Sequence, residues 1–144
     1  MIAIGSDHAG FLMKEMLKEH LKEGGYEVKD FGTFSEDSCD YPEFAHAVAH
    51  AVVGGEAECG ILVCGTGIGM SMCANKFRGI RAVVASDVFS VRHSRLHNNA
   101  NILCLGARVM ARGLACELTD LFLNTEFEGG RHAARIEMFE ECEK

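Results

Sequence analysis

The stretch ILVCGTGIGMS, residues 61–71, runs from apolar side chains through a glycine-rich turn toward helix-forming residues. An apolar run that ends in glycine is typical of a buried strand, and Gly65, Gly67 and Gly69 indicate a tight turn into a helix. A strand that leads through a short turn into a helix is the repeating unit of a parallel α/β sheet. The rest of the chain has the same alternation.

Apolar runs of strand length alternate with longer segments of helical periodicity. The strands are predicted at 1–6, 26–31, 60–64, 80–86 and 101–106. Helices are predicted from Phe11 to Leu21, from the cap at Asp40 to Gly54, and over 69–77, 87–98, 110–124 and 131–142. The strands at 1–6, 60–64 and 101–106 carry no charge, as strands buried on both faces should. The pattern predicts an α/β fold with a doubly wound, five-stranded parallel sheet, in one domain over 1–144 that ends in the helix at 131–142.

Composition excludes several classes of protein. The net charge of −7 argues against a nucleic-acid surface, and no apolar run approaches the roughly 18 residues that span a bilayer, so we expect a cytoplasmic protein without a membrane partner. The seven cysteines are an odd number and several lie in apolar segments, so we expect reduced thiols and not disulfides. They include no C-x-x-C pair, which disfavours a structural zinc site and dithiol redox chemistry.

Doubly wound sheets bind ligands beyond the carboxyl ends of their strands. The glycine loop after Cys64 could direct its N–H groups at an anion, or it could be a tight turn without a ligand. It is not a dinucleotide fingerprint, because Met70 stands where that motif needs glycine, and not a cysteine phosphatase loop, which needs arginine at the same position. Cys64 itself is either an inert buried thiol or a thiolate favoured by the nearby helix N-terminus.

The histidine pairs His46/His50 and His93/His97 have the i,i+4 spacing of metal ligands, but neither has the glutamate of H-E-x-x-H. We therefore expect no metal site, and His97 stays a candidate for proton transfer. Arg131 and Arg135 share one helix face and could grip a phosphate. The alternative is that Arg135 pairs with Glu128 or Glu137 on a solvated face.

Several motifs together resemble the type B ribose-5-phosphate isomerases, a group related to the galactose-6-phosphate isomerase subunits. They are GSDHAGF at 5–11, DYP at 40–42, CGTGIG at 64–69, NKFRGIRA at 75–82, RLHNNAN at 95–101 and EGGRHAAR at 128–135. The resemblance extends in order from residue 1 to about residue 140. It implies a Rossmann-like, flavodoxin-like sheet, at least a homodimer, and no metal or organic cofactor.

The resemblance also implies a reaction, the aldose–ketose isomerisation of a sugar phosphate through an enediolate. Cys64 would move the proton between C2 and C1, and the N–H groups of Gly65, Thr66, Gly67, Ile68 and Gly69 would stabilise the developing charge. Some members use a glutamate base at the position of Met70, and its absence here points back to Cys64.

The remaining roles follow from the same resemblance. Asp7, Thr66 and His97 would open the sugar ring. The phosphate would be held by His8, Arg108, Arg131 and Arg135, with His132 close by and Tyr41 lining the pocket. His97, Asn98 and Arg108 are expected from the neighbouring subunit of the homodimer, or possible tetramer. The expected substrate pair is ribose 5-phosphate and ribulose 5-phosphate; the alternatives are a six-carbon substrate, allose 6-phosphate or galactose 6-phosphate, and a non-catalytic sugar-phosphate sensor.

Overall fold

The computed structural model of the chain describes residues 1–142. Five strands alternate with helices along the sequence. The strands are β1 (Ile2–Ser6), β2 (Val28–Asp30), β3 (Cys59–Cys64), β4 (Ala82–Val84) and β5 (Ile102–Gly106). The helices are α1 (Phe11–Glu23), α2 (Tyr41–Val53), α3 (Ile68–Ala74), α4 (Val88–Leu96), α5 (Arg112–Asn124) and α6 (Arg131–Glu140).

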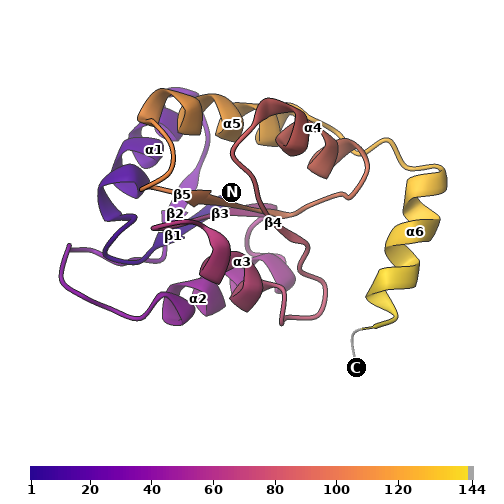
Figure 1. The fold of residues 1–144 in the computed structure, drawn as a ribbon, viewed down its shortest axis with the longest axis horizontal. Helices are drawn as coiled ribbons and strands as arrows, with labels where there is room; N and C mark the ends of the chain where they lie inside the picture. The colour runs from indigo at the N-terminus through magenta and orange to yellow at the C-terminus, as the bar shows by residue number, and fades with distance from the viewer. Residues whose placement is uncertain (143–144) are drawn as a thin grey trace.

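The strands form one parallel sheet in the order β2-β1-β3-β5-β4. Right-handed crossovers place a helix on one face when the chain moves toward β4 and on the other face when it moves back. Accordingly α2 and α3, which lie in the crossover connections that run toward β4, cover one face of the sheet. Helices α1, α4 and α5 cover the other face (Figure 1). The predicted doubly wound fold is confirmed.

Side chains alternate between the two faces along each buried strand. Ile4, Ile61 and Leu103 pack under α1, α4 and α5, whereas Ala3 and Leu62 pack under α2 and α3. Strands β1 and β5 are buried at every position, which confirms the expectation from their lack of charge. The strands β2 and β4 are shorter than predicted, three residues each, because both lie at the sheet's edges.

The helices begin close to their predicted starts, but their caps differ. Asp40 occupies the N-cap position of α2 with extended backbone, yet its side chain accepts no capping hydrogen bond. The predicted N-cap position of Asp40 is therefore confirmed, but the capping hydrogen bond expected from its side chain is not made. Asp87 does cap α4, because its Oδ1 accepts a hydrogen bond from the Ser90 N–H at 2.7 Å.

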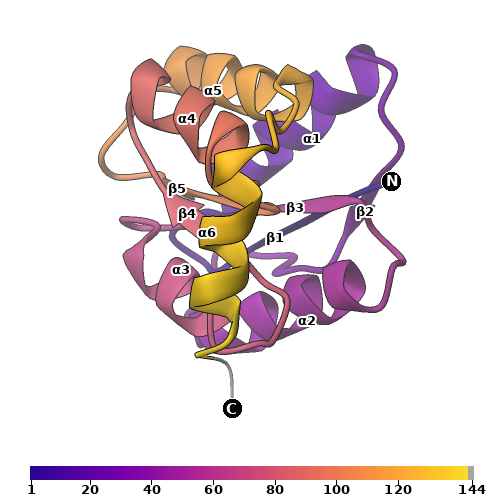
Figure 2. The same ribbon diagram turned by 90° about the vertical axis from the view of Figure 1, so that its right-hand side faces the viewer.

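Helix α6 stands outside the three layers, to one side of the sheet (Figures 1 and 2). The Glu128 N–H donates to the Leu96 carbonyl at 3.1 Å, and an ion pair of 2.8 Å joins Glu140 at its far end to Arg81, just before β4. These contacts hold α6 beside the end of α4. Within residues 1–142, no helix combines the length and the apolar character that crossing a membrane requires.

Candidate active site

The connections of the sheet leave a crevice at the carboxyl ends of β1 and β3. From β1 the chain moves outward to β2, and from β3 it moves the opposite way to β4, so the loops after the two strands diverge. The register pairs Ser6 with Val63, and the Asp7 N–H continues the ladder by donating to the Val63 carbonyl at 3.2 Å. Asp7 therefore lies beside Cys64 at the crevice.

The loop after Cys64 turns back over its sulfur. The Gly67 N–H donates to Cys64 Sγ at 3.2 Å, and Cys64 is only 6% exposed. Gly67 has φ of +82°, a left-handed conformation that a side chain would strain, and a Cβ there would lie 2.9 Å from Val84. The turn therefore directs a backbone N–H at the Cys64 sulfur.

Two side chains pack directly on the glycines of this loop. A Cβ on Gly69 would lie 2.7 Å from two ring carbons of Tyr41, and a Cβ on Gly65 would lie 3.4 Å from the Arg108 side chain. The backbone joins the same segments, since the Arg108 N–H donates to the Gly65 carbonyl at 3.0 Å. Tyr41 and Arg108 therefore belong to the surroundings of the glycine loop, and Arg108 places its positive charge there.

Asp7 and His8 complete this group of residues. Asp7 is 7% exposed, and its Oδ1 accepts a hydrogen bond from the Gly10 N–H at 3.0 Å, which fixes the carboxylate at the start of α1. The Cys39 N–H donates to Nδ1 of His8 at 3.2 Å. Because Nδ1 is an acceptor, the neutral ring carries its proton on Nε2 and can donate it to a ligand.

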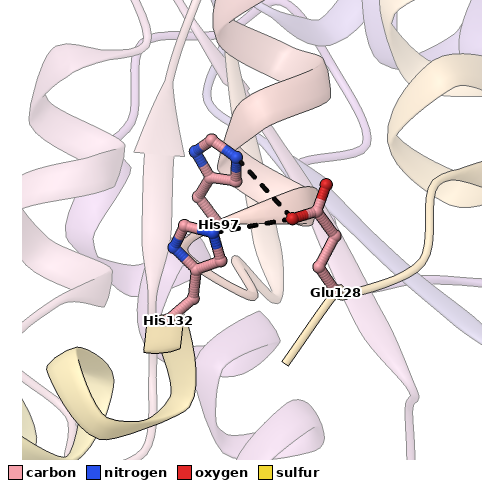
Figure 3. A group of neighbouring side chains, drawn as sticks. All are labelled: His97, Glu128 and His132. Atoms are coloured by element: carbon pink, nitrogen blue, oxygen red, sulfur yellow. Dashed lines mark ion pairs between the residues drawn. The ribbon is translucent and has the colours of Figure 1, made fainter. Parts of the chain in front are cut away.

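A second group of residues forms around the end of α4 and the start of α6. His97 ends α4 and His132 lies in the first turn of α6, and their rings stack with centroids 4.1 Å apart and planes 12° apart. Nε2 of each ring faces the same Glu128 carboxylate oxygen, at 3.9 Å from His97 and 3.5 Å from His132 (Figure 3). Burial, followed by the neighbouring His97 and Arg131, lowers the pKa of His132, so its ring is neutral at pH 7.

The arginines predicted to grip phosphate lie beside this second group. Arg131 and Arg135 are exposed on α6, and Asn98 follows His97. Within residues 1–142 no ion pair joins Arg135 to Glu128 or Glu137, so the alternative reading of this segment as a paired face is not realised. Asn98 lines a hollow of about 760 Å³ together with Phe139 of α6 and basic residues before β4.

The two groups lie at opposite edges of the sheet. Cys64 ends β3 at the carboxyl edge, whereas α4 runs back to the amino edge, where the Asn101 N–H donates to the carbonyl of Arg81 just before β4. The length of a five-residue strand, about 17 Å, separates these edges. Within one chain, His97 and Asn98 are therefore remote from Cys64.

Arg108 differs from the other two residues predicted to cross the interface. It follows β5 at the carboxyl edge and lies against Gly65 of its own chain, because β5 pairs directly with β3 and ends beside it. Within its own chain Arg108 therefore lies beside the loop that follows Cys64, unlike His97 and Asn98.

Other residues singled out from the sequence have structural contacts. His46 and His50 both pack edge-on against Phe77, and His93 stacks on Phe89. Met70 is fully buried in the same core cluster as Cys64. Burial raises the pKa of the Cys59 thiol to about 11 and also raises that of Cys104, so these two remain inert thiols.

Two contributors to the site were not predicted from the sequence. Cys39 supplies the N–H that orients His8 from 31 residues away, and no local pattern marks it. Glu128 is the second: it faces His132 and not Arg135, and its i,i+4 spacing to His132 is the signal in the sequence that links these two residues.

The chain is similar to sugar-phosphate isomerases over nearly its whole length. Residues 2–139 match a family model described as Ribose/Galactose Isomerase. The chain is 52% identical over 136 residues to ribose-5-phosphate isomerase B of Escherichia coli K12, which covers 94% of this chain and 91% of that protein. The solved structure of Clostridium thermocellum ribose-5-phosphate isomerase B superposes with a TM-score of 0.98 at 51% identity, covering 99% of this chain and 96% of the other. A Mycoplasma genitalium ribose-5-phosphate isomerase B, solved with bound ribulose 5-phosphate, superposes with a TM-score of 0.93 at 40% identity, covering 99% of this chain and 95% of the other.

Proposed function

The chain belongs to the ribose/galactose isomerase family, and on that premise we propose that it interconverts ribose 5-phosphate and ribulose 5-phosphate. One observation carries the proposal: Cys64 lies buried at the switch point of the sheet with the Gly67 N–H directed at its sulfur, and Asp7 lies beside it. A buried sulfur that receives a hydrogen bond and lies next to a carboxylate is suited to proton transfer. It has no obvious use in a purely structural turn.

In the proposed mechanism the Cys64 thiolate removes the proton from C2 of the open aldose and returns it to C1. The intermediate is an enediolate, whose negative charge develops on the sugar oxygens. The backbone N–H groups of residues 65–69 favour that charge, and so does the Arg108 guanidinium, which follows β5 and packs against Gly65. Because Met70 is buried in the core, Cys64 is the base available on this loop.

Ring opening precedes proton transfer, because it exposes the carbonyl group that acidifies the C2 proton. We assign this step to Asp7, Thr66 and His97, which move a proton from the anomeric hydroxyl to the ring oxygen. His97 lies at the far edge of its own sheet, so it must act on the Cys64 group of a second copy of the chain. The proposed enzyme is therefore a homodimer at least, in which each site combines residues of two chains.

The phosphate is bound from both sides in this arrangement. His8, with its proton on Nε2, and Arg108 approach from the chain that supplies Cys64. Arg131 and Arg135 approach from the second copy together with His97, Asn98 and His132. This local positive charge explains how a chain with a net charge of −7 can bind an anion.

A coupled assay for ribulose 5-phosphate tests the reaction, and Cys64→Ala tests the base. We expect Cys64→Ala to lower kcat by about 10²- to 10⁴-fold with KM nearly unchanged, whereas Cys142→Ala, which removes an exposed thiol, keeps wild-type turnover. Turnover by Cys64→Ala close to that of the wild type would remove Cys64 from the mechanism.

Two alternatives have their own tests. A comparison of kcat/KM on ribose 5-phosphate, allose 6-phosphate and galactose 6-phosphate identifies the preferred chain length, because a pocket shaped for five carbons excludes the sixth sterically. A sugar-phosphate sensor would bind the sugar without moving its protons. Incorporation of solvent deuterium at C1 or C2 rules out the sensor, and saturable binding without exchange and without turnover supports it.

A further inference from the structure

The group formed by His97, Glu128 and His132 contains the donor atoms of a metal site. One ring nitrogen of each histidine and one carboxylate oxygen of Glu128 lie within 4.8 Å of one another (Figure 3). Two imidazoles and a carboxylate are the ligand set of many three-residue zinc sites, which keep a fourth position open. The residues come from three separate segments, the end of α4, the loop before α6 and the first turn of α6.

The distances in this group differ from those of an ordinary histidine–carboxylate ion pair. In the pair between His20 and Asp120 of the same chain, Nε2 lies 2.8 Å from the carboxylate oxygen. In the group at α6 the corresponding distances are 3.5 Å from His132 and 3.9 Å from His97, too long for hydrogen bonds. A zinc ion held at about 2.0–2.1 Å by tetrahedral ligands would separate those ligands by about 3.3 Å. The spacing is therefore nearer to that of atoms around an ion than to that of a direct pair.

A second observation supports a missing partner. His132 is only 6% exposed, and its buried Nε2 has no hydrogen-bond partner among the described residues. A buried polar atom is normally paired, and this one is directed toward the Glu128 oxygen.

The three side chains can close on an ion without changing the fold. Glu128 is half exposed and His97 lies at the end of its helix, so both can shift, whereas His132 is fixed by burial. The stacked rings present their nitrogens on the same side (Figure 3), and rotation of the His97 ring out of the stack would direct both nitrogens at one point. The exposed side of Glu128 leaves the fourth position to water.

We propose that His97, Glu128 and His132 bind a divalent transition-metal ion such as Zn²⁺, and that the bound ion excludes the sugar phosphate and inhibits the enzyme. The inhibition rests on the proposed function, because His97 and His132 serve the substrate there; the binding does not. The reaction itself requires no metal in this scheme. The ion occupies the nitrogens that the substrate needs, so the two compete.

Binding is tested without substrate by titrating the full-length chain with Co²⁺ and following its visible absorption, then displacing it with Zn²⁺. We expect one ion per chain, and affinity lowered about tenfold or more in Glu128→Gln and in His132→Asn. The matched controls Glu126→Gln and His93→Asn remove a nearby carboxylate and a nearby imidazole and should bind as the wild type does. Wild-type affinity in both Glu128→Gln and His132→Asn would overturn the site, since the ion would then be held by other groups such as the thiols.

Inhibition is tested by Zn²⁺ titration of turnover, with each variant compared with its own metal-free rate. The apparent inhibition constant should rise with ribose 5-phosphate concentration, and Glu128→Gln should be less sensitive to Zn²⁺ by the same factor as its loss of affinity. Equal sensitivity of Glu128→Gln and the wild type would place the inhibitory ion on Cys64 and overturn the inference. Binding of Zn²⁺ to His97, Glu128 and His132 without an effect on turnover would overturn the proposed competition between the ion and the sugar phosphate. An absence of isomerase activity without metal would refute the proposed function and leave the Co²⁺ result to stand alone.

Discussion

Mixing two inactive variants should restore activity if each site is built from two chains. One variant carries Cys64→Ala and the other carries His97→Asn, so each homodimer lacks one required group at both of its sites. In a mixed dimer, the intact Cys64 of one chain meets the intact His97 of the other at one site, and both defects fall at the second site. The basis is that, within one chain, Cys64 and His97 lie at opposite edges of the sheet, which a strand of about 17 Å separates.

The size of the recovery follows from counting sites. Random exchange between equal amounts of the two variants makes half of the dimers mixed, and half of the sites in those dimers are intact, so about one quarter of wild-type activity should return. The variants are purified separately, mixed, dissociated in mild denaturant and refolded together, and turnover is compared with that of each variant treated alone. Size-exclusion chromatography confirms that dimers form.

A matched pair of variants tests which side supplies Arg108. Because Arg108 lies against Gly65 of its own chain, Arg108→Gln mixed with Cys64→Ala should give no recovery: one site loses its base, and the other loses the guanidinium. Recovery near a quarter in this pair would mean that Arg108 crosses the interface. Failure of the Cys64 and His97 pair to recover, with mixed dimers present, would refute the two-chain site.

Three further changes probe the packing around the site. Gly69→Ala would place a Cβ 2.7 Å from the Tyr41 ring, which is 39% exposed and can swing outward. We therefore expect KM to rise roughly tenfold, with the free energy of unfolding nearly unchanged. An unchanged KM would remove Tyr41 from the pocket. Lys14→Met should lower the free energy of unfolding in urea by about 3 kcal/mol, because it leaves the Asp30 carboxylate with Lys18 alone, while Lys22→Met on the exposed face should have little effect. Burial raises the pKa of Asp30, but hydrogen bonds from Lys14 and Lys18 outweigh it and hold that pKa below its usual value, so the stability from Asp30 is present above about pH 4 and is lost as the pH falls through the lowered pKa. Asp30→Asn should flatten this acid limb in urea unfolding measured against pH, and an equally steep limb in that variant would contradict the linkage.

Much of the fold was predictable because its signals are local. The glycine turn after Cys64 and the uncharged runs of β1 and β5 are visible in the sequence, since they depend on backbone conformation and burial within a few residues. Strand order is not local. In the sheet β5 lies between β3 and β4, because the connection from β3 to β4 passes over the position that β5 later fills. No residue in the predicted strands specifies this order.

The candidate site was predictable only in part, for the same reason. Cys64 and Asp7 follow strands, and the rule for doubly wound sheets places them at one edge. Contacts between distant segments could not be read from the sequence: the Cys39 N–H that orients His8, the stacking of His132 on His97, and the fully buried Lys14 that pairs with Asp30 beside the loop carrying Cys39. Lysine is rarely buried, so composition gave no reason to expect Lys14 inside.

The division of the proposed site between two chains also determines what sets the length of the substrate. The reacting carbons C1 and C2 meet Cys64, whose position is fixed by the hydrogen-bonded register of β3 within the sheet. In the proposed site the phosphate on the last carbon would meet Arg131 and Arg135, which lie on a helix outside the layers and would be positioned by the docking of the second copy. The distance between sulfur and guanidinium groups is therefore a property of the interface. Substitutions at the ends of α6, such as removal of the ion pair between Arg81 and Glu140, should change the preference between five- and six-carbon phosphates more than substitutions beneath the sheet.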